Sequence, residues 1–506
     1  SYNSVPVKLM IDIGRTVIIN TAHLAGIQGQ LETWAPMVLG TSALSLIDLT
    51  TGYISFASGG YAAKPYTVLE IRRSNGDVLY ERNARKLLTP ASDLKIVTLS
   101  ATAEKLGWDY TYETQLLALG AIDFGFLDGD LIVRGSGDPS LIDADGMAAG
   151  VFKSWAERLK ALGIRSLSGR IIGDDNAWDD DAYGSGWMYD DMNEGYSAGV
   201  GPLQFNMGET TIGVTPAQSE NTPAAVTIAT EGSGLVLRNK VVTTAAGTPA
   251  RVGTRRIANT NILEVYGTVP AGSQPLQERV AVDNQTLYFV TELRKALIAN
   301  GIEVKGPAVD IDDLPTPPRV HDAVPVVSYR SAPLNALAGT LMELSQNQYA
   351  ETFLKTLGAQ AGAPTFEAGR QVIADVLRSW GIDTAQVLQA DGSGLSRYDV
   401  VTADALASIL VHVAQDPRHD GPFRASLPVA GRPGALAHRL PGTKAAGLVR
   451  AKTGSMRHVR STSGYTTTAD GEPVVFSMIA NNFGIANAEI DRASDAVILK
   501  VFEFTR

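Results

Sequence analysis

Apolar residues along the first hundred positions follow a strand pattern and then a helix pattern. Two segments, 43–56 and 67–80, alternate apolar and polar residues on both sides of a glycine-containing turn, and each predicts two strands joined by a turn. From Asp93 to about Leu106 the spacing of apolar residues changes and predicts a helix. The chain therefore begins with short strands and enters a helix near residue 93.

The middle of the chain, from about residue 108 to 317, is richer in Gly, Asp, Thr and Val. Short strand-like runs such as 225–230 alternate here with two helical patterns, at 152–162 and 286–300. The proline-rich run 314–319 indicates where this part ends. We expect a mostly β inserted region between these limits.

The last third of the chain predicts helices first and a hairpin afterwards. We expect helices at 333–344, 348–357 and 368–379, hairpin strands at 460–468 and 472–481, and a closing helix at 488–504.

Short helices combined with antiparallel strands, split by an inserted region, predict an α+β fold. We expect one discontinuous domain made of residues 1–107 and 318–506. The inserted region, 108–317, is expected to hold two domains, one of them a nested β-rich domain at 209–284.

Composition narrows the classes of partner and cofactor. The chain has 506 residues, a formal net charge of -10 and no cysteine. The negative charge repels phosphate backbones and no dense run of Lys and Arg offsets it, so we expect no nucleic-acid partner. Disulfides and thiolate metal sites are excluded, and the scattered histidines form no His-Glu-x-x-His run. We therefore expect neither a metal nor another cofactor.

No apolar run approaches the roughly 18 residues that a membrane span needs, so we expect no transmembrane segment. The first ten residues, SYNSVPVKLM, lack the basic segment and the long apolar segment of a signal peptide. Two interpretations fit this beginning: a cytoplasmic chain, or the mature form of an exported one.

Ser92 and Lys95 stand three positions apart where the first long helix is expected to begin. Residues three apart on a helix share a face, so the amine of Lys95 can reach the Ser92 hydroxyl. The positive end of the helix favours an alkoxide there, which suits a nucleophile. Serine at a helix start is also an ordinary cap whose hydroxyl accepts a backbone N–H. Taken alone, the pair leaves both interpretations open.

A lysine acting as base must be uncharged, which requires burial or a second cation nearby. Lys452 is a candidate for that cation, on a strand-like segment where Gly454 allows a close approach. Ser345 and Asn347, between two expected helices, could project a hydroxyl and an amide into the same cleft. Each candidate has a plainer alternative. Lys452 could be an ordinary edge-strand lysine, and Ser345 and Asn347 could belong to a polar turn that caps the next helix.

Together, and in this order, Ser-x-x-Lys, Ser-x-Asn and Lys-Thr-Gly form the signature of serine penicillin-binding proteins and related β-lactamases. The chain resembles the low-molecular-mass class C penicillin-binding proteins, a family of D-alanyl-D-alanine carboxypeptidases and endopeptidases. Ser92 and Ser345 lie 253 positions apart, and in that family large inserted domains fill this interval. The segments that carry the resemblance are PASDLK at 90–95, SQNQYAE at 345–351, DGSGLSR at 391–397 and AKTGSM at 451–456.

The resemblance implies a fold like that of penicillin-binding proteins and serine β-lactamases, an antiparallel sheet flanked by helices. It implies Ser92 as nucleophile, Lys95 as general base and Ser345 as a proton relay to the departing D-alanine. Lys452 would supply positive charge, and Asn347 would hold the peptide and Lys95. Asp93 departs from the family, which more often has Thr or Asn there. Gln346 and Ser455 are milder departures that keep the required functional groups.

The resemblance also suggests which groups bind the substrate. Backbone N–H groups of Ser92 and Ser455 would form the oxyanion hole. Thr453, Gly454, Ser455 and Arg397 are candidates for binding the terminal carboxylate, although a structural salt bridge is an alternative role for Arg397. Asp179, in an acid-rich segment, could meet the free amine of a stem peptide, or could belong to a solvated loop.

The expected activity is that of a serine DD-peptidase acting on peptidoglycan stem peptides through an acyl-enzyme, with β-lactams as covalent inhibitors. This activity implies an exported protein, periplasmic or associated with the cell wall. One alternative uses the same site as an esterase, D-amino-acid amidase or β-lactamase. A second alternative is a catalytically idle protein that binds the cell wall.

Overall fold

The structure is a computed structural model that describes residues 15–24, 67–143 and 146–505. The strand–turn–strand unit expected at 43–56 lies outside these residues. Among the helices that the structure describes, none has the length and the apolar character needed to cross a membrane.

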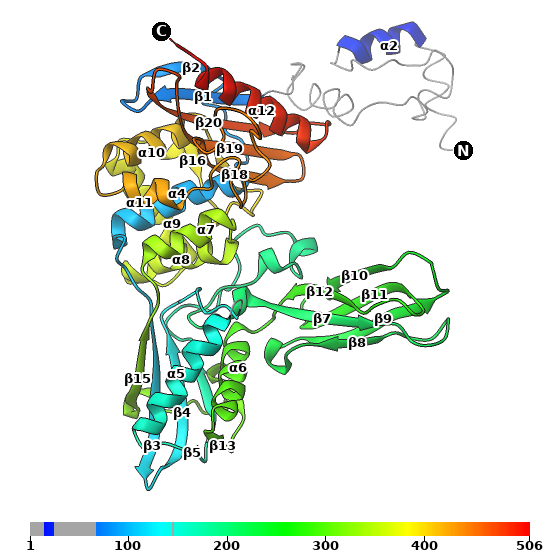
Figure 1. Cartoon of the computed structure of the whole chain (residues 1–506), viewed down its shortest axis with the longest axis vertical. Coiled ribbons are helices and arrows are strands. Elements are labelled where there is room, and N and C mark those ends of the chain that lie inside the picture. Colours follow the sequence, from blue (N-terminus) through cyan, green and yellow to red (C-terminus); the bar gives the residue numbers. More distant parts are fainter. Residues whose placement is uncertain (1–14, 25–66, 144–145, 506) are drawn as a thin grey trace.

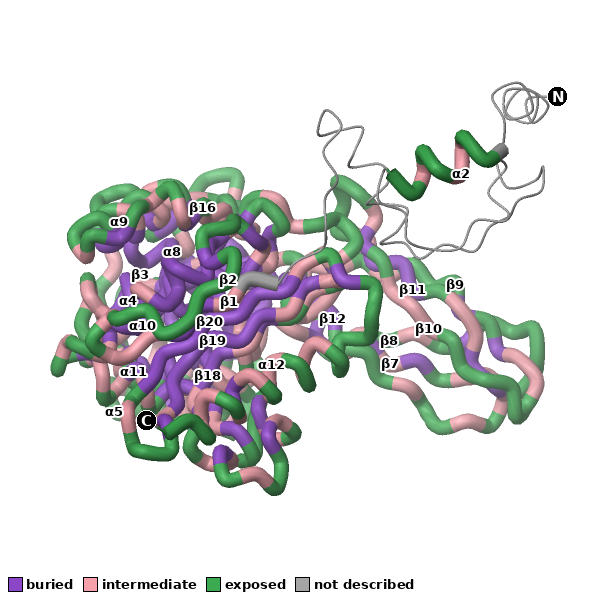
Figure 2. The backbone as a smooth tube through the Cα atoms, turned by 90° about the horizontal axis from the view of Figure 1, so that it is seen from above, coloured by how far each residue is buried: buried purple, intermediate pink, exposed green. Residues whose placement is uncertain are grey.

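A five-stranded antiparallel sheet joins an early hairpin to the C-terminal hairpin (Figure 1). The strand order is β18-β19-β20-β1-β2, because β1 pairs with β20 along its full length. The five strands are β1 (Thr67–Arg73), β2 (Val78–Arg82), β18 (Arg450–Met456), β19 (Val459–Thr467) and β20 (Pro473–Asn481). Figure 2 shows β19 and β20 buried over most of their length, with β2 exposed at the edge.

Helices cover both faces of this sheet. Alternate residues of β20 point to opposite faces, as they must in a strand. Val475 and Ile479 join the core of the main helical layer, whereas Phe476 and Met478 pack with Ile498 of the C-terminal helix. The helical layer contains α4 (Leu94–Leu106), α7 (Leu334–Glu343), α8 (Asn347–Gln360), α9 (Phe366–Ser379), α10 (Ala403–Gln415) and α11 (Asp420–Ser426), and the opposite face carries α12 (Asn487–Phe502).

The expected helices at 333–344, 348–357 and 368–379 correspond to α7, α8 and α9. The sequence did not predict α10, whose residues are buried at most positions. A helix buried on nearly all sides lacks the polar face that makes a helical period visible. A separate helix, α2 (Arg15–Leu24), lies apart from the sheet, near the N-terminus (Figure 1).

The inserted region leaves and rejoins the helical layer through two paired strands. β3 (Glu113–Asp123) starts opposite the end of β15 (Val324–Arg330), with Glu113 facing Arg330. The insertion can therefore occupy some two hundred residues without separating α4 from α7. The same sheet is completed by β4 (Phe126–Gly135), β5 (Ser166–Leu167), β6 (Ile171–Asp174), β13 (Glu303–Val304) and β14 (Ala308–Asp310), and is covered by α5 (Met147–Ala161) and α6 (Gln285–Ala299).

Two three-stranded sheets, β10-β11-β9 and β12-β7-β8, project from the side of this region (Figure 1). They share one small apolar core that includes Ile212 and Val265. Their strands are β7 (Glu209–Thr215), β8 (Ala225–Ile228), β9 (Val236–Thr244), β10 (Arg251–Arg256), β11 (Ile262–Pro270) and β12 (Leu276–Ala281). The inserted region is thus rich in β structure, and the domain limits given above remain our proposal for dividing the chain.

Candidate active site

Ser92 lies in a 3-10 turn, η2 (Ala91–Asp93), directly before α4. The preceding residue, Ala91, has a φ of 48°, a left-handed conformation that costs free energy in a residue with a side chain. Lys95 Nζ lies 3.0 Å from Ser92 Oγ. The Ser92 hydroxyl therefore contacts a lysine, one helical turn along, at the positive end of α4.

Two further oxygens hold the Lys95 amine. Its Nζ donates to Asn347 Oδ1 at 2.6 Å and to the carbonyl oxygen of Ser393 at 2.8 Å. A neutral amine has two N–H bonds and one lone pair, so these two acceptors use both N–H bonds. The lone pair then faces Ser92 Oγ, which is the arrangement that a general base needs.

The surroundings of Lys95 favour its neutral form. Burial, together with the positive charge of Lys452, lowers the pKa of Lys95 to about 7. The carboxyl groups of Asp391, Glu351 and Asp399 oppose this shift. A substantial fraction of Lys95 is therefore uncharged near neutral pH.

Lys452 is fully buried on the edge strand β18, where its Nζ donates to the Thr453 carbonyl oxygen at 2.7 Å. Burial lowers the pKa of Lys452, and the carboxyl group of Asp93 opposes the change.

Gly454 allows β18 to approach the start of α4, as its sequence position predicts. A Cβ atom on Gly454 would lie 2.9 Å from the Ser92 backbone nitrogen and 2.4 Å from the Pro90 carbonyl oxygen.

The second motif forms the turn between α7 and α8. Ser345 has a φ of 55°, so its backbone is left-handed two residues before Asn347, the first residue of α8. The Asn347 amide nitrogen donates to the Tyr196 carbonyl oxygen at 2.8 Å. Because the amide donates on that side, its oxygen is directed at Lys95. Lys95 thus meets Asn347 directly, whereas the Ser345 hydroxyl makes no hydrogen bond to Ser92 or Lys95 in the described structure.

Three residues in or beside the site were missed by the sequence reasoning: Ser393, Glu351 and Asp399. The backbone N–H groups of Gly392 and Ser393 donate to the buried Glu351 carboxylate, each at 2.8 Å. Glu351 follows Asn347 by one helical turn, so its spacing could have indicated a shared face. The carbonyl group of Ser393 carried no such signal, because any residue type supplies a backbone carbonyl.

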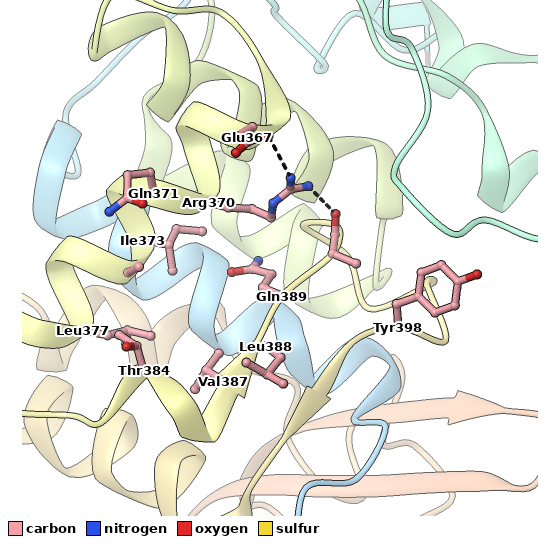
Figure 3. A pocket seen from close by; sticks show the side chains of 12 residues that line it. Glu367, Arg370, Gln371, Ile373, Leu377, Thr384, Val387, Leu388, Gln389 and Tyr398 are labelled. Carbon is pink, nitrogen blue, oxygen red and sulfur yellow. Dashed lines mark hydrogen bonds and ion pairs between the residues drawn. The ribbon is translucent and has the colours of Figure 1, made fainter.

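The same segment is fixed from the other side by α9. Arg370 donates to the Ala390 carbonyl oxygen at 2.8 Å and lies 3.9 Å from a Glu367 carboxylate oxygen (Figure 3). The cavity drawn there has a volume of about 390 Å³ and is also lined by Gln389 and Tyr398. This cavity lies behind the segment that carries Ser393, and Arg370 helps to hold that segment in place.

The acid-rich segment after residue 174 lies beside the site. Trp187 Nε1 donates to Asp391 Oδ2 at 2.9 Å, and Asp391 in turn accepts the backbone N–H groups of Ser393 and Gly394. The hydrogen bond between the Trp187 indole and the Asp391 carboxylate therefore joins the acid-rich segment to the segment whose Ser393 carbonyl holds Lys95.

The structure gives Asp179 and Arg397 different surroundings. Asp179 accepts a hydrogen bond from the fully buried ammonium group of Lys355 on α8. Arg397 is exposed and donates to the Arg457 carbonyl oxygen at 3.4 Å. Within the described part of the chain, the Arg397 guanidinium makes no ion pair, so the alternative of a structural salt bridge gains no support.

Among the described residues, two groups of side chains combine residue types that can bind metals, and hydrogen bonds engage several of them. In the first group, Trp108 Nε1 donates to His419 Nδ1 at 3.1 Å, so the ring hydrogen is on Nε2, 2.8 Å from Glu104. In the second, Asp175 and Asp310 accept hydrogen bonds from Thr286 and Asn284. Hydrogen bonds to the protein thus already engage several of the candidate ligand atoms in both groups.

Comparisons with known proteins agree with this geometry. The model of the D-Ala-D-Ala carboxypeptidase 3 (S13) family matches residues 66–500. The chain is 34% identical over 451 residues to a D-alanyl-D-alanine carboxypeptidase of Actinomadura sp. (strain R39), covering 86% of this chain and 81% of that protein. It is 26% identical over 459 residues to D-alanyl-D-alanine carboxypeptidase DacB of Haemophilus influenzae, covering 88% of this chain and 90% of that protein.

The fold is shared with a solved structure. The crystal structure of penicillin binding protein 4 (dacB) from Haemophilus influenzae superposes with a TM-score of 0.76 at 23% identity. The match covers 89% of this chain and 99% of that one. This likeness supports the expected penicillin-binding-protein fold with its large inserted region. The chain belongs to the D-Ala-D-Ala carboxypeptidase 3 (S13) family and is a serine DD-peptidase.

Proposed function

We propose that Ser92 is the nucleophile of this peptidase and that Lys95 is its general base. The observation that carries the proposal is the 3.0 Å contact between Lys95 Nζ and Ser92 Oγ, with the two N–H bonds of a neutral amine already directed at Asn347 and Ser393. In that state the Lys95 lone pair takes the hydroxyl proton while Ser92 Oγ attacks the substrate carbonyl carbon.

The attack places negative charge on the substrate carbonyl oxygen. Backbone N–H groups of Ser92 and Ser455 are our candidates for stabilising this oxyanion, and the close approach of Gly454 to Ser92 supports that assignment. Removing one such donor in another serine hydrolase costs about 2.7–4 kcal/mol of transition-state stabilisation. The positions of η2 and β18 therefore bear directly on the rate.

Collapse of the tetrahedral intermediate breaks the peptide bond and needs a proton on the departing amine. We assign the transfer of that proton, from Lys95 to the leaving D-alanine, to the Ser345 hydroxyl. Water then attacks the acyl-enzyme with Lys95 as base, which regenerates Ser92 and releases the shortened peptide.

The substrate that we propose is the D-Ala-D-Ala end of a peptidoglycan stem peptide. Lys452 supplies positive charge near its terminal carboxylate, and the hydroxyls of Thr453 and Ser455 are candidate donors to that carboxylate. Arg397 is a further candidate because its guanidinium is exposed and makes no ion pair among the described residues. Such a substrate lies outside the cytoplasmic membrane, so we propose an exported, periplasmic or cell-wall location.

β-Lactams carry a reactive amide that Ser92 can attack in the same way, and we propose them as covalent inhibitors. The test is to incubate the protein with a labelled penicillin and to locate the adduct by peptide mass spectrometry. We expect one adduct, on Ser92, and none in the Ser92→Ala variant. Release of D-alanine from a stem pentapeptide, measured in parallel, tests the peptidase reaction itself. A folded protein that forms no adduct and releases no D-alanine contradicts the proposal.

A further inference from the structure

Asp93, between the proposed nucleophile and base, is a buried carboxyl group that the mechanism above does not use. Its side chain is fully buried, and its Oδ2 accepts a hydrogen bond from Ser463 Oγ at 2.7 Å. Its other oxygen, Oδ1, is also buried and has no hydrogen-bond partner in the part of the chain that is described. A buried carboxylate with a free oxygen is costly unless a cation compensates it.

The contact with Ser463 places Asp93 beside Lys452. Ser463 on β19 is the direct cross-strand partner of Lys452 on β18, so both side chains stand on the same face of the sheet. Ser463 Oγ also contacts Ser477 Oγ on β20 at 2.9 Å, which fixes its position. The Asp93 carboxylate is therefore bonded to the residue that stands directly opposite Lys452 on the sheet.

Few other charges act on these groups. Asp93 faces Lys95, on its own helix, and Lys452 from β18. Lys452 faces Asp93 and, from α7, Glu343. Lys95 faces Lys452 and the carboxyl groups of Asp391, Glu351 and Asp399. Glu343 is only partly buried, whereas Asp93 is fully buried, so Asp93 is the carboxylate with the strongest hold on the charge of Lys452.

We propose that the Asp93 carboxylate is the counter-ion of Lys452 and a positioning residue that moves the alkaline limit of the reaction to higher pH. The proposal rests on the roles given above to Lys95 and Lys452. Activity needs an uncharged Lys95 and a charged Lys452, so Lys95 sets the acidic limit of the range and Lys452 the alkaline limit. An anion at Asp93 favours the charged form of Lys452, so the alkaline limit then lies at higher pH.

The pKa shifts of Asp93 and Lys452 agree with this role. Burial raises the pKa of Asp93 to about 7, and the Ser463 hydrogen bond and the charge of Lys452 limit that rise, so Asp93 is anionic on the alkaline side of the profile. Burial lowers the pKa of Lys452, and Asp93 raises it. Each group thus supports the charged form of the other against the cost of burial.

The experiment compares Asp93→Asn with the wild-type protein. The second-order rate constant for acylation by a fluorescent penicillin is measured from about pH 5 to about pH 9.5. We expect the alkaline limit of the Asp93→Asn profile to move to lower pH by about one unit, because a neutral amide no longer supports the Lys452 ammonium group. Asp138→Asn, a buried carboxyl group in the inserted region that bonds Ser140, is the matched control and should keep the wild-type profile.

The inference is overturned if the maximal acylation rate constant of Asp93→Asn falls while both limits of its pH profile stay in place, since that result describes a purely structural role. So does a profile identical to that of the wild type. Asp93→Thr provides a second neutral variant and must give the same displacement. Failure of both variants to fold also contradicts the inference, because Lys452, whose pKa burial lowers to about 8, can lose its charge when the carboxylate is removed. A wild-type protein that is not acylated at any pH instead contradicts the proposed nucleophile and base.

Discussion

Lys95 and Asn347 are 252 positions apart in the chain, yet Lys95 Nζ donates to Asn347 Oδ1 at 2.6 Å. This hydrogen bond joins the start of α4 to the start of α8 across the whole inserted region. It also orients the amine, because an amide oxygen can only accept. The acceptor is neutral, and a charged acceptor at this position would change the pKa of Lys95.

Asn347→Asp tests that point. A carboxylate beside Lys95 stabilises the ammonium form and raises its pKa by about 1–3 units. We therefore expect the acidic limit of the acylation profile to move to higher pH, with acylation near neutral pH falling accordingly. Stopped-flow measurement of penicillin acylation against pH checks this. Asn300→Asp, at the end of α6, is the control and should leave the limit unchanged.

The wild-type enzyme should itself show the low pKa of Lys95. The folded-state pKa lies near 7, below the ordinary lysine value of 10.5, so the neutral base is present above about pH 7 and is lost as the pH falls through that value. We expect the acylation rate to be half-maximal near pH 7 on its acidic side. A profile whose rate rises only above about pH 9 would mean that Lys95 keeps an ordinary pKa.

Lys95→Arg should remove the base while retaining a long cationic side chain. Arginine stays protonated throughout the working range, so it cannot accept the Ser92 proton. We expect acylation to fall by about 10²–10⁴-fold, the usual contribution of a general base. Lys105→Arg, at the exposed end of the same helix, should acylate at the wild-type rate. Near-normal acylation of Lys95→Arg would contradict the proposed base.

Gly454→Ala tests the close approach of β18 to η2. The added methyl group would lie 2.2 Å from Ser461 Oγ, 2.4 Å from the Pro90 carbonyl oxygen and 2.9 Å from the Ser92 backbone nitrogen, so strand or turn must shift. A displaced Ser92 N–H weakens the proposed oxyanion hole, and we expect kcat for D-alanine release to fall by about 10²–10³-fold. Gly339→Ala in α7 meets no atom within 4 Å and should keep the wild-type kcat.

Asp179→Asn separates two roles for that carboxylate. The side chain of Lys355 is fully buried, and in this variant its ammonium group would keep only neutral acceptors, the introduced amide oxygen and the backbone carbonyl oxygens of Asp179 and Asp181. A structural role predicts a loss of about 1–3 kcal/mol in the free energy of unfolding, with an unchanged KM. A substrate-binding role predicts a raised KM for stem peptides that carry a free amine. Asp180→Asn, an exposed neighbour, should affect neither quantity.

Much of the local geometry was predictable. The three-residue spacing of Ser92 and Lys95 predicted their contact, because a helical turn brings such residues together on one face. Gly454 predicted a close backbone approach, and apolar alternation predicted the hairpin that forms β19 and β20. In the serine–lysine pair and the hairpin, the interacting atoms lie within a few residues of one another. At Gly454, the missing side chain itself indicates a close backbone contact.

The sequence by itself therefore determined which groups could carry the chemistry and which local element holds each of them. Only the tertiary structure decided what surrounds them: the Ser393 carbonyl that holds Lys95, the carboxylate of Glu351 behind it, and the closeness of Lys452 and Asp93. Periodicity encodes the faces of single helices and strands, whereas burial and Coulomb interactions depend on segments hundreds of residues apart. The pKa of Lys95, and with it the ability to act as a base, is set by those distant segments.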